Sequence, residues 1–399
     1  MVLKTTSMER PPASRSAWLI LLVLLTASVA APLNQFKVPP LLPLLMDAFQ
    51  LPISQAGSLM SVFTLTGLIL ALPSGFILQR LGYRLTGLMA VGAVILGAAL
   101  GAFSQTVGLL LFSRIVEGAG VSLIGVTAPV VIALWFATER RATAMGVWSA
   151  WYPLGSIIML LIAPWMAGRW HWQSVWWFGC AFAVAGFTLF LIFIKPRSQE
   201  EAPRVRLTGE DVRQALRSRD LWLLCAFFLL LNLPLIAFGT WAPTYFQQAL
   251  NISLAKASFL SAAAALACIA AGPTSGWLSD RLRSRKVVCL YPVLAITLVW
   301  PVVPLLKLGH VLPFMLAFGF VTGLAAPGVF AAAAEVVRNE RLGGLAMAVI
   351  MIGQNGGMLI GPIFFGWMVE TTGGWTYAFW SLMPICALAA VVMSRIRIR

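Results

Sequence analysis

Apolar stretches long enough to cross a bilayer recur twelve times in this chain. Crossing about 30 Å of hydrocarbon takes roughly 20 helical residues. A membrane β-barrel would instead show alternating strands of about ten residues. The sequence therefore predicts an all-α membrane protein with twelve transmembrane helices. The approximate spans are 17–46, 54–79, 85–103, 107–135, 142–167, 173–194, 220–246, 255–278, 287–306, 311–336, 344–369 and 375–394.

The low charge content supports a lipid environment. Of 399 residues, 60% are hydrophobic and 10% are charged, whereas a soluble domain carries roughly 25% charged residues. A net charge of +15 would suit a nucleic-acid partner. However, the basic residues lie in short loops between apolar spans and form no continuous basic face. We therefore expect the lipid bilayer as a partner and no nucleic acid.

The placement of Lys and Arg predicts the topology. With the N-terminus inside, 23 of the 28 basic residues fall in cytoplasmic segments, as the positive-inside rule requires. Both termini are then cytoplasmic. Lys37 and Arg114 are left inside predicted helices.

The longest polar segment divides the chain into two halves. We expect an N-terminal six-helix bundle over 1–194, a cytoplasmic linker over 195–219, and a C-terminal six-helix bundle over 220–399. Within the linker, TGEDVRQALRS (208–218) is typical of a short amphipathic helix.

The two halves repeat each other. GFILQRLGYR (75–84) matches GWLSDRLRSRK (276–286), and a longer match relates residues 135–164 to 336–362. These matches indicate parallel repeats of six helices.

On these motifs the chain resembles the major facilitator superfamily of transporters. The family pattern after the second helix is G-x-x-x-D-R-x-G-x-R, although Gln79 stands here where the family has Asp. RIVEGAG (114–120) resembles the family's fourth-helix motif. The gating-loop residues implied by the resemblance are Gly75, Arg80, Gly82 and Arg84 in the first copy and Asp280 and Arg281 in the second.

The resemblance implies a secondary transporter in which two bundles close alternately on either side of a central site. It also implies a monomer in the bacterial inner membrane. We expect no enzymatic activity and no cofactor or metal, because no cluster of nucleophile, base or metal-ligand residues is apparent in the sequence.

Three ionisable residues lie deep in the predicted helices, where they are costly and usually functional. Lys37 either contacts an anionic substrate in the cavity or extends its side chain to the membrane surface. Arg114 and Glu117 share a helix face. They form either a self-neutralising packing pair or a proton-coupled group, with Glu117 as the proton carrier, a role that the family resemblance favours.

Further polar and aromatic side chains lie on helices that line the central cavity in the resembled family. They are Asn34, Gln35, Trp148, Tyr152, Asn232, Trp241, Tyr245, Gln354 and Asn355. Amide and phenol groups can orient a polar ligand, and rings supply contact area. A second tryptophan group is interpreted as an interfacial belt. It comprises Trp170, Trp172, Trp176 and Trp177.

The predicted cavity charges sum to +1, which favours a small organic or inorganic anion, with the proton as a coupling partner. A drug/proton antiporter is the alternative, and the many tryptophans fit it. However, cationic drugs need a counter-charge, and intramembrane carboxylates are scarce. A non-transporting sensor is a third reading, for which the sequence shows no signalling domain.

Overall fold

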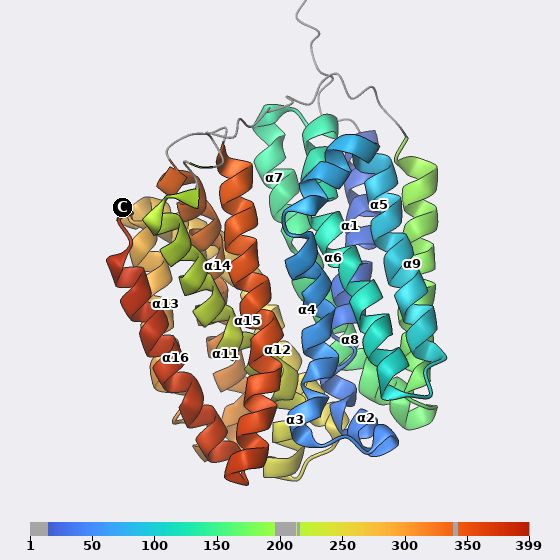
Figure 1. Ribbon diagram of the computed structural model, residues 1–399, viewed down its shortest axis with the longest axis vertical. Coiled ribbons are helices and arrows are strands. Elements are labelled where there is room, and N and C mark those ends of the chain that lie inside the picture. The colour runs from blue at the N-terminus through green and yellow to red at the C-terminus, as the bar shows by residue number, and fades with distance from the viewer. Residues whose placement is uncertain (1–14, 196–212, 214–215, 338–341, 399) are drawn as a thin grey trace, which may run out of the picture.

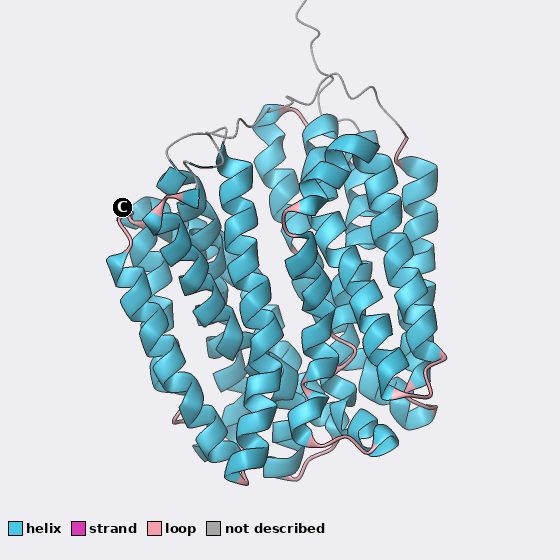
Figure 2. Cartoon of the chain, viewed as in Figure 1, coloured by secondary structure: helices cyan, strands magenta, loops and turns pink. Residues whose placement is uncertain are grey.

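The computed structural model describes residues 15–195, 213, 216–337 and 342–398. Figure 2 shows helices joined by short loops throughout this described part. Among the described residues, eleven helices are long and apolar enough to cross a membrane. The helix expected at 208–218 lies mostly outside the described residues.

The helices form two bundles that stand side by side (Figure 1). The first-half elements are α1 (Arg15–Gln35), η1 (Pro39–Leu41), α2 (Leu42–Phe49), α3 (Ile53–Ala56), α4 (Ser58–Leu70), α5 (Pro73–Ala102), α6 (Val107–Trp135), α7 (Thr138–Ser149), α8 (Trp151–Arg169) and α9 (Gln173–Phe193). The second-half elements are α11 (Arg219–Leu250), α12 (Leu254–Leu282), α13 (Arg285–Val299), η3 (Val303–Leu305), α14 (Leu308–Val337), α15 (Gly343–Thr372) and α16 (Trp375–Arg395).

The ninth predicted span differs most from expectation. Instead of one helix over 287–306, the structure has α13, a turn, and the short η3. Proline cannot donate a backbone hydrogen bond, and Pro301 and Pro304 fall in this stretch. With 15 residues, α13 alone is shorter than a typical membrane crossing, so the turn and η3 extend this span.

The first predicted span is also interrupted. Helix α1 ends at Gln35, and a turn over 36–38 leads into η1 and α2. In a continuous helix the N–H of residue 39 would bond the Gln35 carbonyl, but Pro39 has no N–H. The sequence thus breaks this helix inside the bundle and frees a carbonyl at Gln35.

The predicted loop between the second and third spans is a sharp kink inside α5. Gly82 has φ 77° and ψ 163° there, a conformation that favours glycine. Gly82 is buried, and it has no side chain to accommodate there. This kink lets the chain reverse direction within a few residues.

Large apolar side chains cover the outside of both bundles. Phe112 (55% exposed), Trp165 (62%) and Leu298 (69%) are examples. Exposed apolar surface on this scale suits contact with lipid rather than water.

The two bundles meet where α15 packs against α3 and α4, and along α8 and α12. Glycines allow close approach at the first of these seams. A Cβ added at Gly57 would lie 2.2 Å from the Pro362 carbonyl oxygen, and one at Gly366 would lie 2.6 Å from the Ile53 carbonyl oxygen. These contacts lie at the end of the molecule opposite the chain termini.

Candidate functional site

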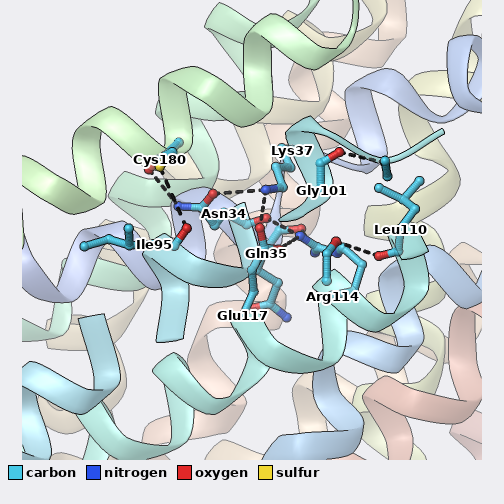
Figure 3. A network of polar contacts seen from close by, with 12 residues as sticks. Asn34, Gln35, Lys37, Ile95, Gly101, Leu110, Arg114, Glu117 and Cys180 are labelled. Atoms are coloured by element: carbon cyan, nitrogen blue, oxygen red, sulfur yellow. Dashed lines mark hydrogen bonds and ion pairs between the residues drawn. The ribbon is translucent and has the colours of Figure 1, made fainter. Parts of the chain in front are cut away.

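A fully buried group of three charged side chains lies inside the first-half bundle (Figure 3). Lys37 comes from the break after α1, and Arg114 and Glu117 come from α6. All three are 0% exposed. We call these three residues the charge cluster.

Glu117 bridges the two cations. Its Oε1 is 2.5 Å from Lys37 Nζ, and its Oε2 pairs with Arg114 Nη1. The pairing of Arg114 with Glu117 predicted from their spacing is therefore present. The partnership with Lys37 joins residues 80 positions apart.

The broken helix supplies oxygen acceptors for Arg114. Arg114 Nη1 donates to the Asn34 carbonyl at 2.7 Å, and Nη2 donates to the Gln35 carbonyl at 2.9 Å. Its Nε donates to the Leu59 carbonyl at 3.1 Å. The absence of an N–H at Pro39 thus leaves the Gln35 carbonyl available to a guanidinium rather than to the helix.

Lys37 is held on three sides. Its ammonium donates to Asn34 Oδ1 at 3.1 Å in addition to Glu117. The same nitrogen lies 4.4 Å from the ring centroid of Trp176, within the range of a cation–π interaction. Asn34 is itself fixed, because its Nδ2 donates to the Ala30 and Gly179 carbonyls.

Two expectations require correction here. Lys37 does not extend its side chain to the membrane surface, because it is completely buried and paired with Glu117. Trp176 is not part of an interfacial belt, because it is 0% exposed and packs against Lys37. Trp170 and Trp177, at 54% and 44% exposed, do lie on the outside. The helical spacing that buries Trp176 gave no sign that a cation lies against it.

Gln35 contacts the charge cluster through its main chain and not through its side chain. Its carbonyl binds Arg114, whereas its side-chain amide lies near the Tyr152 hydroxyl on α8. Tyr152 also makes an edge-to-face contact with Phe36, with centroids 5.5 Å apart. Tyr152 is half-buried. The predicted residues Gln35 and Tyr152 are therefore neighbours.

Other predicted binding residues use their polar atoms elsewhere. Trp148 Nε1 donates to Ser28 Oγ at 3.0 Å, and Trp241 Nε1 donates to the Pro362 carbonyl at 3.0 Å. Tyr245 donates to the Val303 carbonyl at 3.1 Å. These three side chains contribute to packing in this structure, and a role in binding substrate remains a prediction.

The predicted amides of the second half are dispersed. Asn232 and Asn355 each donate to a carbonyl of their own helix, on Phe228 and Met351 respectively. Asn355 also faces the first half, because a Cβ added at Gly67 would lie 2.6 Å from its Oδ1. Gln354 is half-buried on the same helix.

The predicted gating loops lie at the end that carries the termini. Arg84 Nη2 donates to the Leu191 carbonyl at 3.1 Å, within its own bundle. Arg281 lies over the Trp277 ring, 5.2 Å from its centroid. Gln79, Arg80 and Asp280 are exposed. Gly75 has open space around its Cα. The role of these residues in gating remains a prediction.

Known proteins resemble this chain in sequence and in fold. The sequence profile of the Major Facilitator Superfamily matches residues 24–343 and, in a second match, 250–399. The chain belongs to the Major Facilitator Superfamily. Its relatives in this superfamily are transporters, not enzymes.

Two relatives and one solved structure illustrate the superfamily match. The hexuronate transporter of Bacillus subtilis is 24% identical over 94% of this chain and 93% of its own length. Monocarboxylate transporter 12 of Rattus norvegicus is 25% identical over 78% of this chain and 70% of its own length. The crystal structure of a bacterial homologue of the lysosomal transporter Spinster, inward-facing and unoccupied, shares the fold with a TM-score of 0.75. It is 14% identical and covers 95% of this chain and 96% of its own.

Proposed function

We propose that this superfamily member is a secondary transporter that moves a small organic anion together with a proton by alternating access. The observation that carries the proposal is the charge cluster, in which two buried cations share one buried carboxylate. The two relatives described above are named for a hexuronate and for monocarboxylates, which are carboxylate anions. Their names favour an organic carboxylate over an inorganic ion.

The charge balance of the cluster explains the coupling that we propose. With Glu117 ionised, the cluster holds a net charge of +1. When Glu117 takes up a proton, the net charge becomes +2, and a nearby anion is attracted more strongly. By linkage, a bound anion raises the affinity of Glu117 for its proton to the same extent. The two ligands therefore travel together.

The cluster is buried in this conformation, so direct contact of an anion with Lys37 requires rearrangement of the break after α1. A broken helix is suited to this, because its free carbonyls and non-helical residues can change partners without unwinding a continuous helix. Protonation of Glu117 would release the Lys37 ammonium from its closest partner. We assign Lys37 and Arg114 to anion binding and Glu117 to proton transfer.

We also propose that both termini are cytoplasmic, as the positive-inside rule favours. The family resemblance favours a monomer in the bacterial inner membrane. The bundles are joined at the end opposite the termini by α4 and α15. In this topology, that is the outer end. The structure would then correspond to a conformation closed to the outside.

The deciding experiment uses proteoliposomes with a pH-sensitive dye inside. An inward gradient of glucuronate, which crosses lipid poorly, is expected to acidify the lumen with the wild type. Protein-free vesicles and the Gly92→Ala variant serve as controls, because a Cβ there meets its nearest neighbour at an ordinary 3.9 Å. A second arm screens lactate and malate. Proton release on addition of cationic drugs, without a response to any carboxylate, would establish the antiporter alternative.

A further inference from the structure

Gln35 carries a buried amide whose two polar atoms form no hydrogen bond of good geometry, although the Tyr152 hydroxyl lies close by. The side chain is 1% exposed, and neither its Nε2 nor its Oε1 forms a hydrogen bond of good geometry. Among the described residues it is the one side chain with two such atoms. Leaving a buried polar group without a good hydrogen bond lowers the stability of the fold. A group kept at this cost in the break after α1 points to a ligand.

The surroundings of Gln35 connect the charge cluster to the seam between the bundles. Its main-chain carbonyl binds Arg114. Its amide lies near the Tyr152 hydroxyl of α8. Helices α8 and α12 pack together at this seam. The amide therefore faces the region where the two bundles meet, one residue away from the carbonyl that Asn34 gives to Arg114.

The chemistry of these groups selects a ligand class. The Gln35 amide offers one acceptor and two donor hydrogens, and the Tyr152 phenol offers a donor and an acceptor. A simple carboxylate only accepts hydrogen bonds and therefore cannot donate to Gln35 Oε1. A hydroxyl group on the substrate donates to Oε1 while its own oxygen accepts from Nε2 or from the phenol. The pair is therefore matched to a carboxylate that also carries hydroxyl groups.

We propose that Gln35 and Tyr152 make this transporter selective for hydroxylated carboxylates over carboxylates of equal length without hydroxyls. The inference rests on the proposed function, because the charge cluster supplies the attraction for the carboxylate. The Gln35 side chain hydrogen-bonds the hydroxyl of the substrate. The main-chain carbonyl of Gln35 holds Arg114 in place. Discrimination of this kind arises because a site built for a hydroxyl leaves its polar groups unpaired when the hydroxyl is missing.

The test measures binding to purified full-length protein in detergent, by the ligand-induced rise in thermal stability. Three pairs matched in carbon number and charge are titrated: lactate with propionate, malate with succinate, and gluconate with hexanoate. Binding in detergent avoids the passive diffusion of neutral acids through vesicles. We expect the wild type to prefer the hydroxylated member of at least one pair by roughly tenfold, the size of one to two net hydrogen bonds.

The decisive variant is Gln35→Leu, which keeps the side-chain bulk and removes the amide. We expect its preference within the pair to fall below roughly twofold, while binding of the hydroxyl-free member is unchanged. Because the wild-type amide forms no hydrogen bond of good geometry, the unliganded variant should be at least as stable as the wild type. Tyr152→Phe should lose part of the preference. Thr244→Val is the matched control, because Thr244 Oγ1 is also buried and unpartnered but lies on α11.

The outcomes separate this inference from the proposed function. If carboxylates bind but the wild type does not discriminate within any pair, or if Gln35→Leu keeps the preference, the inference is overturned and the proposed function stands. In that case an ordered water satisfies the amide. If no carboxylate stabilises the wild type, both fail together. Loss of all binding in Gln35→Leu with a normal fold would assign Gln35 to positioning Arg114 instead, and would also overturn the selective role.

Discussion

The carboxylate of Glu370 joins the two bundles by a hydrogen bond to the main chain of Ser54. Its Oε2 accepts from the Ser54 backbone N–H at 2.7 Å. Glu370 lies near the end of α15 and Ser54 in the first turn of α3. A carboxylate is favoured at a helix start, where backbone N–H groups lack partners inside the helix. This contact closes the end of the molecule opposite the termini.

Removing this bond should favour the conformation that is open at that end. Glu370→Ala removes the acceptor, and Ser54→Pro removes the donor at a position in the first helical turn, where proline is tolerated. We expect each variant to increase the open population a few-fold. Spin labels at Gln50 and Thr372 on a background without reactive cysteines would report the distance between bundles.

The double variant provides the control. If the hydrogen bond is the cause, Glu370→Ala combined with Ser54→Pro should shift the distance distribution no further than either change alone. Additive shifts would show that each substitution acts locally on its own helix, and the contact would then have no role in closure.

Neutralising Glu117 should destabilise the protein unless a cation is removed with it. Glu117→Gln leaves Lys37 and Arg114 buried without a counter-charge, and breaking such a pair costs about 3–5 kcal/mol. Combining it with Lys37→Met restores the wild-type net charge of +1 and should recover much of the loss. Thermal unfolding in detergent compares the two variants, and a double variant less stable than Glu117→Gln would contradict the charge argument.

Glu117→Gln should also uncouple transport from protons. With the carboxylate gone, anion uptake should no longer acidify the vesicle lumen, while exchange of labelled anion against internal anion continues. The comparison is made at equal protein incorporation. Acidification at the wild-type rate would remove Glu117 from the proton pathway.

Lys37 variants separate anion binding from structural support. Lys37→Ala leaves Arg114 and Glu117 as a neutral pair, so we expect normal expression together with a loss of uptake of roughly tenfold or more, since a charge-assisted contact is stronger than a neutral one. Lys37→Arg keeps the charge but places a larger, planar group against Trp176. Uptake by Lys37→Ala at the wild-type rate would assign Lys37 a purely structural role.

The contact between α5 and α6 beneath the charge cluster depends on glycine. A Cβ added at Gly97 would lie 2.5 Å from Glu117 Cγ and 2.7 Å from the Ser113 carbonyl oxygen. Gly97→Ala should therefore push α6 away and lower stability by about 1–3 kcal/mol, with a loss of uptake. Gly92→Ala on the same helix should change neither thermal unfolding nor uptake. Equal behaviour of the two variants would contradict the packing argument.

Much of the fold could be predicted, because membrane crossing imposes one length and one composition on each span. Helix boundaries could not be predicted where a proline or a glycine changes the local backbone. Pro39 breaks the first span, Pro301 shortens the ninth, and Gly82 turns a predicted loop into a kink. Each residue is visible in the sequence, but the effect of a proline depends on which carbonyl loses its donor, and the effect of Gly82 depends on its positive φ.

The candidate site was only partly predictable. Arg114 and Glu117 are three positions apart, so their contact follows from helix geometry. The bond from Lys37 to Glu117 and the ring of Trp176 against Lys37 depend on the packing of three separate helices. A single sequence carries no periodic signal for such long-range contacts. The two prolines after Val38 were the available sign that Lys37 lies in a break.

The glycine contacts between α15 and the residues from Ile53 to Gly57 just before α4 bear on how readily the bundles can part. At Gly57 and Gly366, main chain lies against main chain across the seam, so few long side chains are interlocked there. When such surfaces separate, few side chains gain rotamer freedom, and when they come together again few side chains lose it. In the proposed alternating-access cycle, opening and reclosing this seam would carry a small entropic penalty each time.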